Sequence, residues 1–195
     1  MKDNKQMRVL FVDTTTPDLV VAVVRENSID DFSRRNLGTK HSETLCQCVS
    51  DALKQCNLSF DDFDAYACAI GPGSFTGIRI GIATVKGYAL AVPKPVIAVN
   101  CLESIANSAT CGKKGCAIIN AGNGYYFADY KRGVAPTLIP FEDEQAKCAG
   151  SCIGAADCVD GSAEIIRRKF AEKQFDSALS PLYIRRSQAE EKWKN

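Results

Sequence analysis

The stretch 65–91 reads AYACAIGPGSFTGIRIGIATVKGYALA and decides the fold. Residues 65–70 form an apolar run of the kind that makes a buried strand, and they lead directly into the glycine-rich turn 71–77. From that turn to residue 91 the chain is apolar and contains no proline, which predicts a helix capped by Ser74 or Thr76. A buried strand followed at once by a helix is the building unit of an α/β fold.

Strand and helix patterns continue on both sides of this unit. Two β-branched runs, RVLFVD at 8–13 and LVVAVVR at 19–25, predict a strand hairpin. The more polar stretch 29–36 predicts an edge strand. Apolar residues at four-residue spacing predict a helix over 41–56 that begins at Ser42 or Glu43. Further elements are expected at 96–99 (strand), 102–108 (helix), 116–120, 125–131 and 136–140 (short strands) and 161–172 (helix).

The charge balance argues against direct binding to nucleic acid. The 195 residues include 24 Lys+Arg and 23 Asp+Glu, a formal net charge of +1, so no overall field draws the chain to nucleic acid or to an anionic membrane. No apolar run approaches the roughly 20 residues that span a bilayer, and residues 1–6 are polar, unlike a signal peptide. We therefore expect a cytosolic protein without a membrane segment.

Ten cysteines are a high number for this length. Without a secretory signal they are expected to be reduced thiols, several of them buried as small hydrophobic residues. None has the spacing of a zinc site, and the nearest approach is the spread of Cys148, Cys152 and Cys158. No metal site is predicted, and Cys111 and Cys116 are expected on an exposed loop, open to oxidation.

The glycine-rich turn admits two interpretations. A strand, then Gly71 and Gly73, then a helix N-terminus at Ser74 would present backbone N–H groups to an anion such as a phosphate. The glycine spacing matches neither the dinucleotide fingerprint nor the P-loop, and close packing of strand and helix explains the same glycines. Asp13 and Thr14, at the end of the first strand, either contact a nucleotide's metal and phosphates or form the turn that shapes the hairpin.

His41 is the only histidine, so any histidine-based acid–base chemistry must use it. Its position at a helix start beside Ser42 and Glu43 predicts capping and solvent exposure. A Ser74 nucleophile with His41 as its base is not expected, because residues 71–77 lack the GxSxG elbow of the hydrolases.

Three motifs resemble the TsaB family, also called YeaZ. They are VDTTT at 12–16, HSETL at 41–45 and GPGSFTGIRIGIATVKGYALAVPKPVIAVNCLESIA at 71–106, with weaker echoes at 120–126 and in PLYIR at 181–185. The resemblance implies an α/β fold of the actin, hexokinase and Hsp70 class, the ASKHA fold, with two ribonuclease-H-like lobes. It assigns residues 1–108 to the first lobe and 109–195 to a shortened second lobe. Asn120 and Gly122 stand where the family usually has Asp and Arg.

By this resemblance the chain would be a non-catalytic accessory subunit in the formation of N6-threonylcarbamoyladenosine at position 37 of tRNA. Family members form a heterodimer with the catalytic subunit TsaD, the ATPase TsaE joins the assembly, and tRNA is reached only through the complex. No intrinsic cofactor is expected, and ATP or ADP would bind only at the interface of the complex. One histidine cannot build the metal-binding histidine pair of TsaD, which independently fits a non-catalytic role.

The resemblance also places the partner surface, which would serve a homodimer too, on the two helices of the first lobe. The second helix is apolar on nearly every side and contains Gly81 and Gly87, which independently indicates a second buried surface. Changing Val85 to Glu is expected to abolish pairing and leave the chain folded. The expected central contact residues are Leu45, Val49, Leu53, Ile78, Ile82, Val85 and Ala89, flanked by Arg79 and Lys86.

Two enzyme functions compete with the accessory role. A small phosphotransferase-like enzyme would hold ATP with Asp13 and the glycine turn, although the second lobe offers no comparable acidic strand end. A glycoprotease-like peptidase is disfavoured by the single histidine and by the lack of an HExxH motif. Binding or turnover of ATP by the isolated chain would distinguish the first of these from an accessory subunit.

Overall fold

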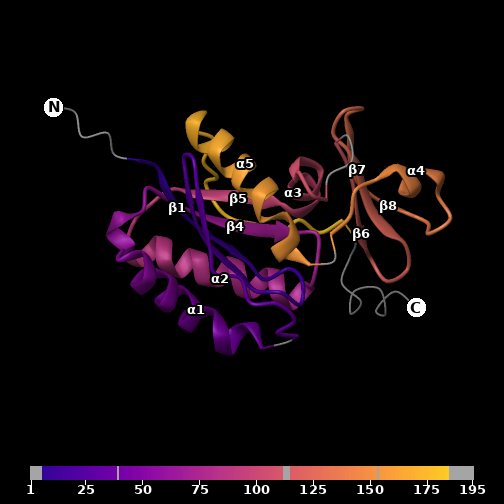
Figure 1. Cartoon of the computed structure of the whole chain (residues 1–195). Helices are drawn as coiled ribbons and strands as arrows, with labels where there is room; N and C mark the ends of the chain where they lie inside the picture. Colours follow the sequence, from indigo (N-terminus) through magenta and orange to yellow (C-terminus); the bar gives the residue numbers. More distant parts are fainter. Residues whose placement is uncertain (1–5, 39, 112–114, 153, 185–195) are drawn as a thin grey trace.

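A computed structural model describes residues 6–38, 40–111, 115–152 and 154–184. Two sheets organise it: a five-stranded sheet in the order β3-β2-β1-β4-β5 and a three-stranded sheet in the order β6-β7-β8, which lies beside one end of the first (Figure 1). In the larger sheet β1 pairs antiparallel with β2 and parallel with β4, while β3 and β5 form the edges. The strands are β1 (Arg8–Asp13), β2 (Val20–Arg25), β3 (Ile29–Asp31), β4 (Ala65–Gly71) and β5 (Val96–Asn100).

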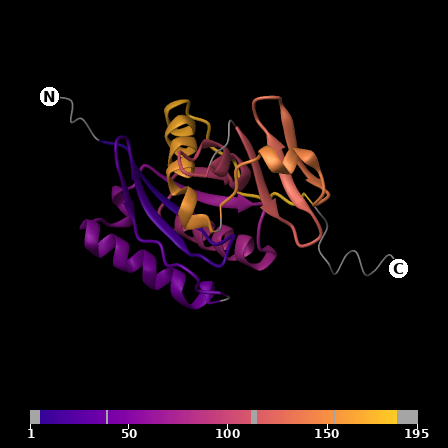
Figure 2. The ribbon, with the colours of Figure 1, turned by 45° about the vertical axis from the view of Figure 1, so that its right-hand side comes forward.

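Between their end residues the central strands are almost continuously apolar, because helices cover both faces of the sheet (Figure 2). Along β1, Leu10 and Val12 pack with α1 (His41–Cys56) and α2 (Phe75–Ala91). Val9 and Phe11 point to the opposite face and pack in a cluster with α5 (Val159–Ala171). The fold therefore has a three-layer first part, with α3 (Cys101–Asn107) beside α5.

Helix α5 returns to the first sheet from the far end of the chain. It crosses α3 so closely that a Cβ atom on Gly161 would lie 2.0 Å from the carbonyl oxygen of Ser104. The side-chain hydroxyl of Ser162 donates to that of Ser104 at 2.9 Å. The boundary expected at residue 108 stays a prediction, and part of the stretch 109–195 covers the first sheet.

The smaller sheet is antiparallel and consists of β6 (Cys116–Asn120), β7 (Tyr125–Asp129) and β8 (Val134–Ile139). After α4 (Glu144–Cys148) the chain runs back along β6, where Gly150 forms a parallel bridge with Ala117. A 3-10 turn, η2 (Ala155–Cys158), then leads into α5; another, η1 (Phe60–Asp62), precedes β4.

Most expected elements are confirmed, with differences at their ends. The edge strand stops at Asp31 instead of residue 36, because beyond it only the bridge between Leu19 and Arg34 continues the pairing. The first helix begins at His41, one residue earlier than expected, and β7 ends at Asp129, where a turn held by the Asp129 carboxylate begins. The short elements α4, η1 and η2 were not predicted. Within the described ranges, none of the helices combines the length and the apolar character needed to cross a membrane.

Candidate functional site

The glycine-rich turn is packed tightly against the turn that follows β1. Ser74 donates its backbone N–H to the carbonyl of Thr15 at 2.7 Å, and its side chain accepts the N–H of Gly77 at 3.1 Å, which confirms Ser74 as the cap of α2. A Cβ atom on Gly73 would lie 2.5 Å from the Thr15 carbonyl oxygen. Close packing therefore accounts for these glycines, and the alternative, a phosphate contact at this turn, stays a prediction.

Asp13 and Thr14 lie beneath this turn and not at a surface. The Asp13 carboxylate accepts hydrogen bonds from the backbone N–H and the hydroxyl of Thr15, both at 2.7 Å, and the residue is 5% exposed. Burial raises the pKa of Asp13, and the bonds from Thr15 oppose that rise. These bonds form the turn that was one of the two alternatives, and contact of Asp13 and Thr14 with a nucleotide stays a prediction.

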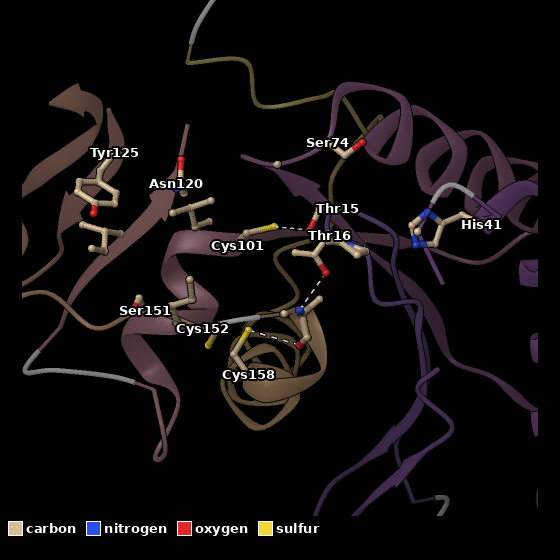
Figure 3. A pocket seen from close by; sticks show the side chains of 18 residues that line it. Thr15, Thr16, His41, Ser74, Cys101, Asn120, Tyr125, Ser151, Cys152 and Cys158 are labelled. Atoms are coloured by element: carbon tan, nitrogen blue, oxygen red, sulfur yellow. Dashed lines mark hydrogen bonds between the residues drawn. The ribbon is translucent and has the colours of Figure 1, made fainter. Parts of the chain in front are cut away.

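A cavity of about 720 Å³ separates the two sheets (Figure 3). The turn after β1 and the start of α2 line one side of it, and α3, β6 and the segment before α5 line the other. This volume falls in the range of small-molecule sites. The lining consists of Thr15, Thr16, Pro17, Gly38, His41, Gly73, Ser74, Cys101, Ile105, Ile118, Ile119, Asn120, Tyr125, Ser151, Cys152, Gly154, Ala155 and Cys158.

The chemical character of this lining is neutral. Among the described lining residues there is no aspartate, glutamate, lysine or arginine, and the apolar side chains of α3 and β6 form much of the wall. Gly73 and Ser74 border the cavity, whereas Asp13, Thr14 and Gly71 do not. A triphosphate would find no charged side chain here to neutralise it.

His41 is buried, which contradicts the expectation of a solvent-exposed capping residue. It is 4% exposed, and its Nε2 atom lies 3.1 Å from the carbonyl oxygen of Asp18. The helix cap is Lys40, without a side-chain cap bond. His41 and Ser74 both line the cavity but come from different helices, and no hydrogen bond between them is found among the described residues. The histidine therefore fastens α1 to the turn after β1.

The expected centre of the partner surface faces the chain's own sheet. Five of its residues are at most 5% exposed and belong to the core beneath α1 and α2, so they cannot meet a partner: Leu45, Val49, Ile78, Ile82 and Val85. Leu53 and Ala89 are half-buried against the same core. The expectation for Val85→Glu is wrong, because a carboxylate at this fully buried position would disrupt the fold of the free chain.

The opposite side of α2 carries an exposed ridge, which we define as Arg79, Ala83, Lys86, Gly87 and Leu90. Apart from the adjacent pair Lys86 and Gly87, neighbouring members of this set are three or four residues apart, so they share one helix face. Leu90 is 82% exposed, an unusual state for a large apolar side chain, and a Cβ atom on Gly87 would meet nothing within 4 Å. Of the residues expected at the partner surface, Arg79 and Lys86 lie on this ridge.

An aromatic cluster closes the N-terminal end of the ridge. The rings of Phe75 and Tyr183 stack with centroids 5.1 Å apart, and the guanidinium of Arg79 lies 3.9 Å from the centroid of Phe75. Arg79 also donates to the Tyr183 hydroxyl at 3.0 Å. The neighbouring Leu182 donates its N–H to the carbonyl of Ile70 at 2.8 Å, which fixes the segment that carries Tyr183 beside β4.

No disulfide joins the cysteines whose side chains the structure describes. Three of them line the cavity: Cys101, Cys152 and Cys158. Among the residues that the structure describes, no three histidine, cysteine or acidic side chains gather as metal ligands would. Of the three cysteines closest to the spacing of a zinc site, Cys148 has a side chain that lies outside the described part of the structure. Cys111 and Cys116 are partly buried instead of exposed.

Comparison with known proteins agrees with this architecture. The family model described as "TsaD: tRNA N6-adenosine threonylcarbamoyltransferase" matches residues 35–150. The tRNA threonylcarbamoyladenosine biosynthesis protein TsaB of Escherichia coli (strain K12) is 35% identical over 131 residues, 65% of this chain and 56% of that protein. The protein of the same name from Bacillus subtilis (strain 168) is 30% identical over 138 residues, 69% of this chain and 60% of that protein.

The solved structure titled "YeaZ from Pseudomonas aeruginosa" superposes with a TM-score of 0.74 at 22% identity, covering 90% of this chain and 100% of that one. This likeness establishes the actin, hexokinase and Hsp70 class of fold with its ribonuclease-H-like organisation. In the matched regions the chain spans 56% and 60% of the length of the two TsaB proteins. By its sequence and its fold, the chain belongs to the TsaB (YeaZ) family.

Proposed function

We propose that this chain is a non-catalytic accessory subunit that binds a TsaD-type catalytic subunit in the formation of N6-threonylcarbamoyladenosine in tRNA. The observation that carries the proposal is the exposed ridge of α2. Leu90, with 82% of its surface exposed, stands beside Ala83 and Gly87, so the helix offers an apolar surface that another helix can approach closely. The TsaB relatives, named for biosynthesis of this modified nucleoside, indicate which pathway supplies the partner.

Aromatic and positively charged side chains add to the ridge as a binding surface. Aromatic and arginine side chains dominate the energetics of many protein interfaces, and Phe75, Arg79 and Tyr183 form such a group at one end. Lys86 adds a positive charge on the same face. We infer that the helical pair of a TsaD-type subunit packs here and that, without that subunit, a second copy of this chain can occupy the same face.

The cavity supports a non-catalytic role over a phosphotransferase. Its described lining carries no aspartate, glutamate, lysine or arginine for a phosphate or a metal, and the His41 ring that lines it contacts the backbone of Asp18. With a net charge of +1 the chain has no field that favours tRNA, so tRNA is reached through the complex. Association with a TsaE-type ATPase, and ATP or ADP at the interface of the complex, stay predictions of family membership.

Reconstitution with the TsaD subunit from the same cell tests this function. Light scattering should give the mass of a one-to-one complex. Formation of threonylcarbamoyladenosine by the TsaD-containing mixture should depend on this chain, and the chain alone should not turn over ATP. ATP turnover by the isolated chain, with no complex formed, would support the phosphotransferase-like enzyme instead.

A further inference from the structure

Two cysteines at the wall of the inter-sheet cavity lie against each other. Cys158 is the last residue of η2 and is 5% exposed, whereas Cys152 stands six residues earlier in the sequence and is only partly buried. Both pack in one apolar cluster with Leu102 and Ile105 of α3, and Figure 3 shows the two sulfur atoms on the same wall. Contact with the Cys152 thiol, together with burial, raises the pKa of Cys158.

The described residues around these cysteines, 150–152 and 154–158, contact both sheets. At the start of this stretch, Gly150 exchanges backbone hydrogen bonds with β6, to the Cys116 carbonyl at 3.0 Å and from the Ile118 N–H at 2.8 Å. At its other end, Ala155 donates its N–H to the Thr16 hydroxyl at 3.0 Å, on the turn after β1. A disulfide between Cys152 and Cys158 would cross-link two points of the chain that lie between these contacts.

We propose that Cys152 and Cys158 are an oxidative modification site, at which a small hydroperoxide converts the two thiols into a reversible disulfide that fixes the connection between the sheets. The cavity gives the oxidant access to Cys152, the more exposed thiol of the pair. Two neighbouring thiols can be oxidised reversibly in this way, because a sulfenic acid formed on one thiol condenses with the other to a disulfide.

The chemistry balances with hydrogen peroxide as the oxidant. The Cys152 sulfur attacks one peroxide oxygen, so an S–O bond forms, the O–O bond breaks and one water leaves. The Cys158 sulfur then attacks the Cys152 sulfur, so the S–S bond forms, the S–O bond breaks, and the proton of Cys158 leaves with the hydroxide as a second water. Two electrons pass from the two thiols to the peroxide.

The Cys158 thiol itself donates to the Ala155 carbonyl at 3.5 Å, and the other two nearby thiols contact different groups. The Sγ atom of Cys101 lies 3.5 Å from the Thr15 hydroxyl, and burial raises its pKa well above the ordinary cysteine value. The thiol of Cys111 donates to the carbonyl of Asp157 at 3.3 Å, on the outer side of η2. Cys111 is therefore a matched control, since it lies close to the pair but does not line the cavity.

The test is peroxide treatment of the full chain, followed by alkylation of the remaining free thiols and peptide mapping by mass spectrometry. We expect one cross-linked product that joins Cys152 to Cys158, removed by dithiothreitol, lost in Cys152→Ser and in Cys158→Ala, and retained in Cys111→Ser. Oxidised wild type should also unfold at a higher temperature than the reduced protein, a shift absent in Cys152→Ser. Over-oxidation of Cys152 to a sulfinic acid, a cross-link to Cys101 or Cys111, or no reaction would overturn the proposal. The map of the wild type decides this even if a variant fails to fold.

Discussion

The side chain of Thr14 donates a hydrogen bond of 2.7 Å to the backbone carbonyl of Gly77, 63 residues away in the chain. Through this bond the turn after β1 holds the first turn of α2. The same two residues approach so closely that a Cβ atom on Gly77 would lie 1.9 Å from the Thr14 carbonyl oxygen. The glycine-rich turn is thus a joint that sets the position of α2, and with it the position of the exposed ridge.

Replacing Gly77 by alanine should open this joint. The added methyl group must push the Thr14 backbone away, and we expect the free energy of unfolding to fall by about 3 kcal/mol, the scale of a strongly overpacked core. Urea denaturation followed by circular dichroism measures the change. A fall of less than about 1 kcal/mol in the free energy of unfolding would show that the turn tolerates a side chain at residue 77 and does not fix the position of α2.

Gly87→Ala on the same helix is the matched control. A Cβ atom there meets nothing within 4 Å, so the higher helix propensity of alanine should raise the free energy of unfolding by about 0.5–1 kcal/mol. The opposite signs of the two Gly→Ala changes would separate packing at the joint from the general effect of losing a helical glycine.

The buried carboxyl group of Asp13 should make stability depend on pH. Because burial raises its folded-state pKa above the ordinary value of 3.8, its contribution to stability is fully present below the pKa of the unfolded chain and is lost as the pH rises through the folded pKa. We expect the free energy of unfolding of the wild type, relative to Asp13→Asn, to decline from about pH 4 upward. The slope has a limit of about 1.4 kcal/mol per pH unit. Urea titrations of both proteins at several pH values measure the difference, and a difference that rises with pH would contradict the assignment.

The Thr16 hydroxyl ties the segment 150–158 to the first sheet. It accepts the N–H of Ala155 at 3.0 Å and that of Asp18 at 3.2 Å, so Thr16→Val leaves two backbone donors without their acceptor. We expect a loss of about 1–3 kcal/mol in the free energy of unfolding. Faster amide hydrogen exchange at Ala155 should accompany it.

The nearby ion pair between Arg35 and Asp157 provides the contrast. It joins the loop after β3 to η2 at 2.7 Å, but the arginine side chain is 59% exposed, so Arg35→Ala should change stability little. An equal fall in the free energy of unfolding of Thr16→Val and Arg35→Ala would mean that the Thr16 hydroxyl contributes no more to stability than the exposed ion pair does.

The strand and helix pattern of residues 8–108 could be read from the sequence because local periodicity decides it. The helix over residues 41–56 ends where its apolar spacing ends, and Ser74 caps α2 as its position before an apolar run predicted. Short elements without a strong pattern, such as α4 and η1, were missed for the same reason.

The sequence could not show which apolar face of a helix meets a partner. The strongest apolar stripes of α1 and α2, which include Val49 and Val85, pack against the chain's own sheet. The ridge that is left exposed is marked by small residues such as Gly87 and by one large one, Leu90, and this pattern has no distinctive period. The burial of His41 depends on the backbone of Asp18, and the return of α5 to the first sheet is a tertiary relationship, so neither could be read from local sequence.

The most direct test of the accessory role is the affinity of two matched surface variants for the TsaD-type subunit, measured by isothermal titration calorimetry. Leu90→Glu puts a charge on the ridge, and Leu138→Glu makes the same change at an exposed leucine of β8. We predict that both variants fold like the wild type, that Leu90→Glu weakens binding about tenfold or more, and that Leu138→Glu binds normally. Wild-type affinity of a folded Leu90→Glu variant would contradict the assignment of the α2 ridge as the partner surface.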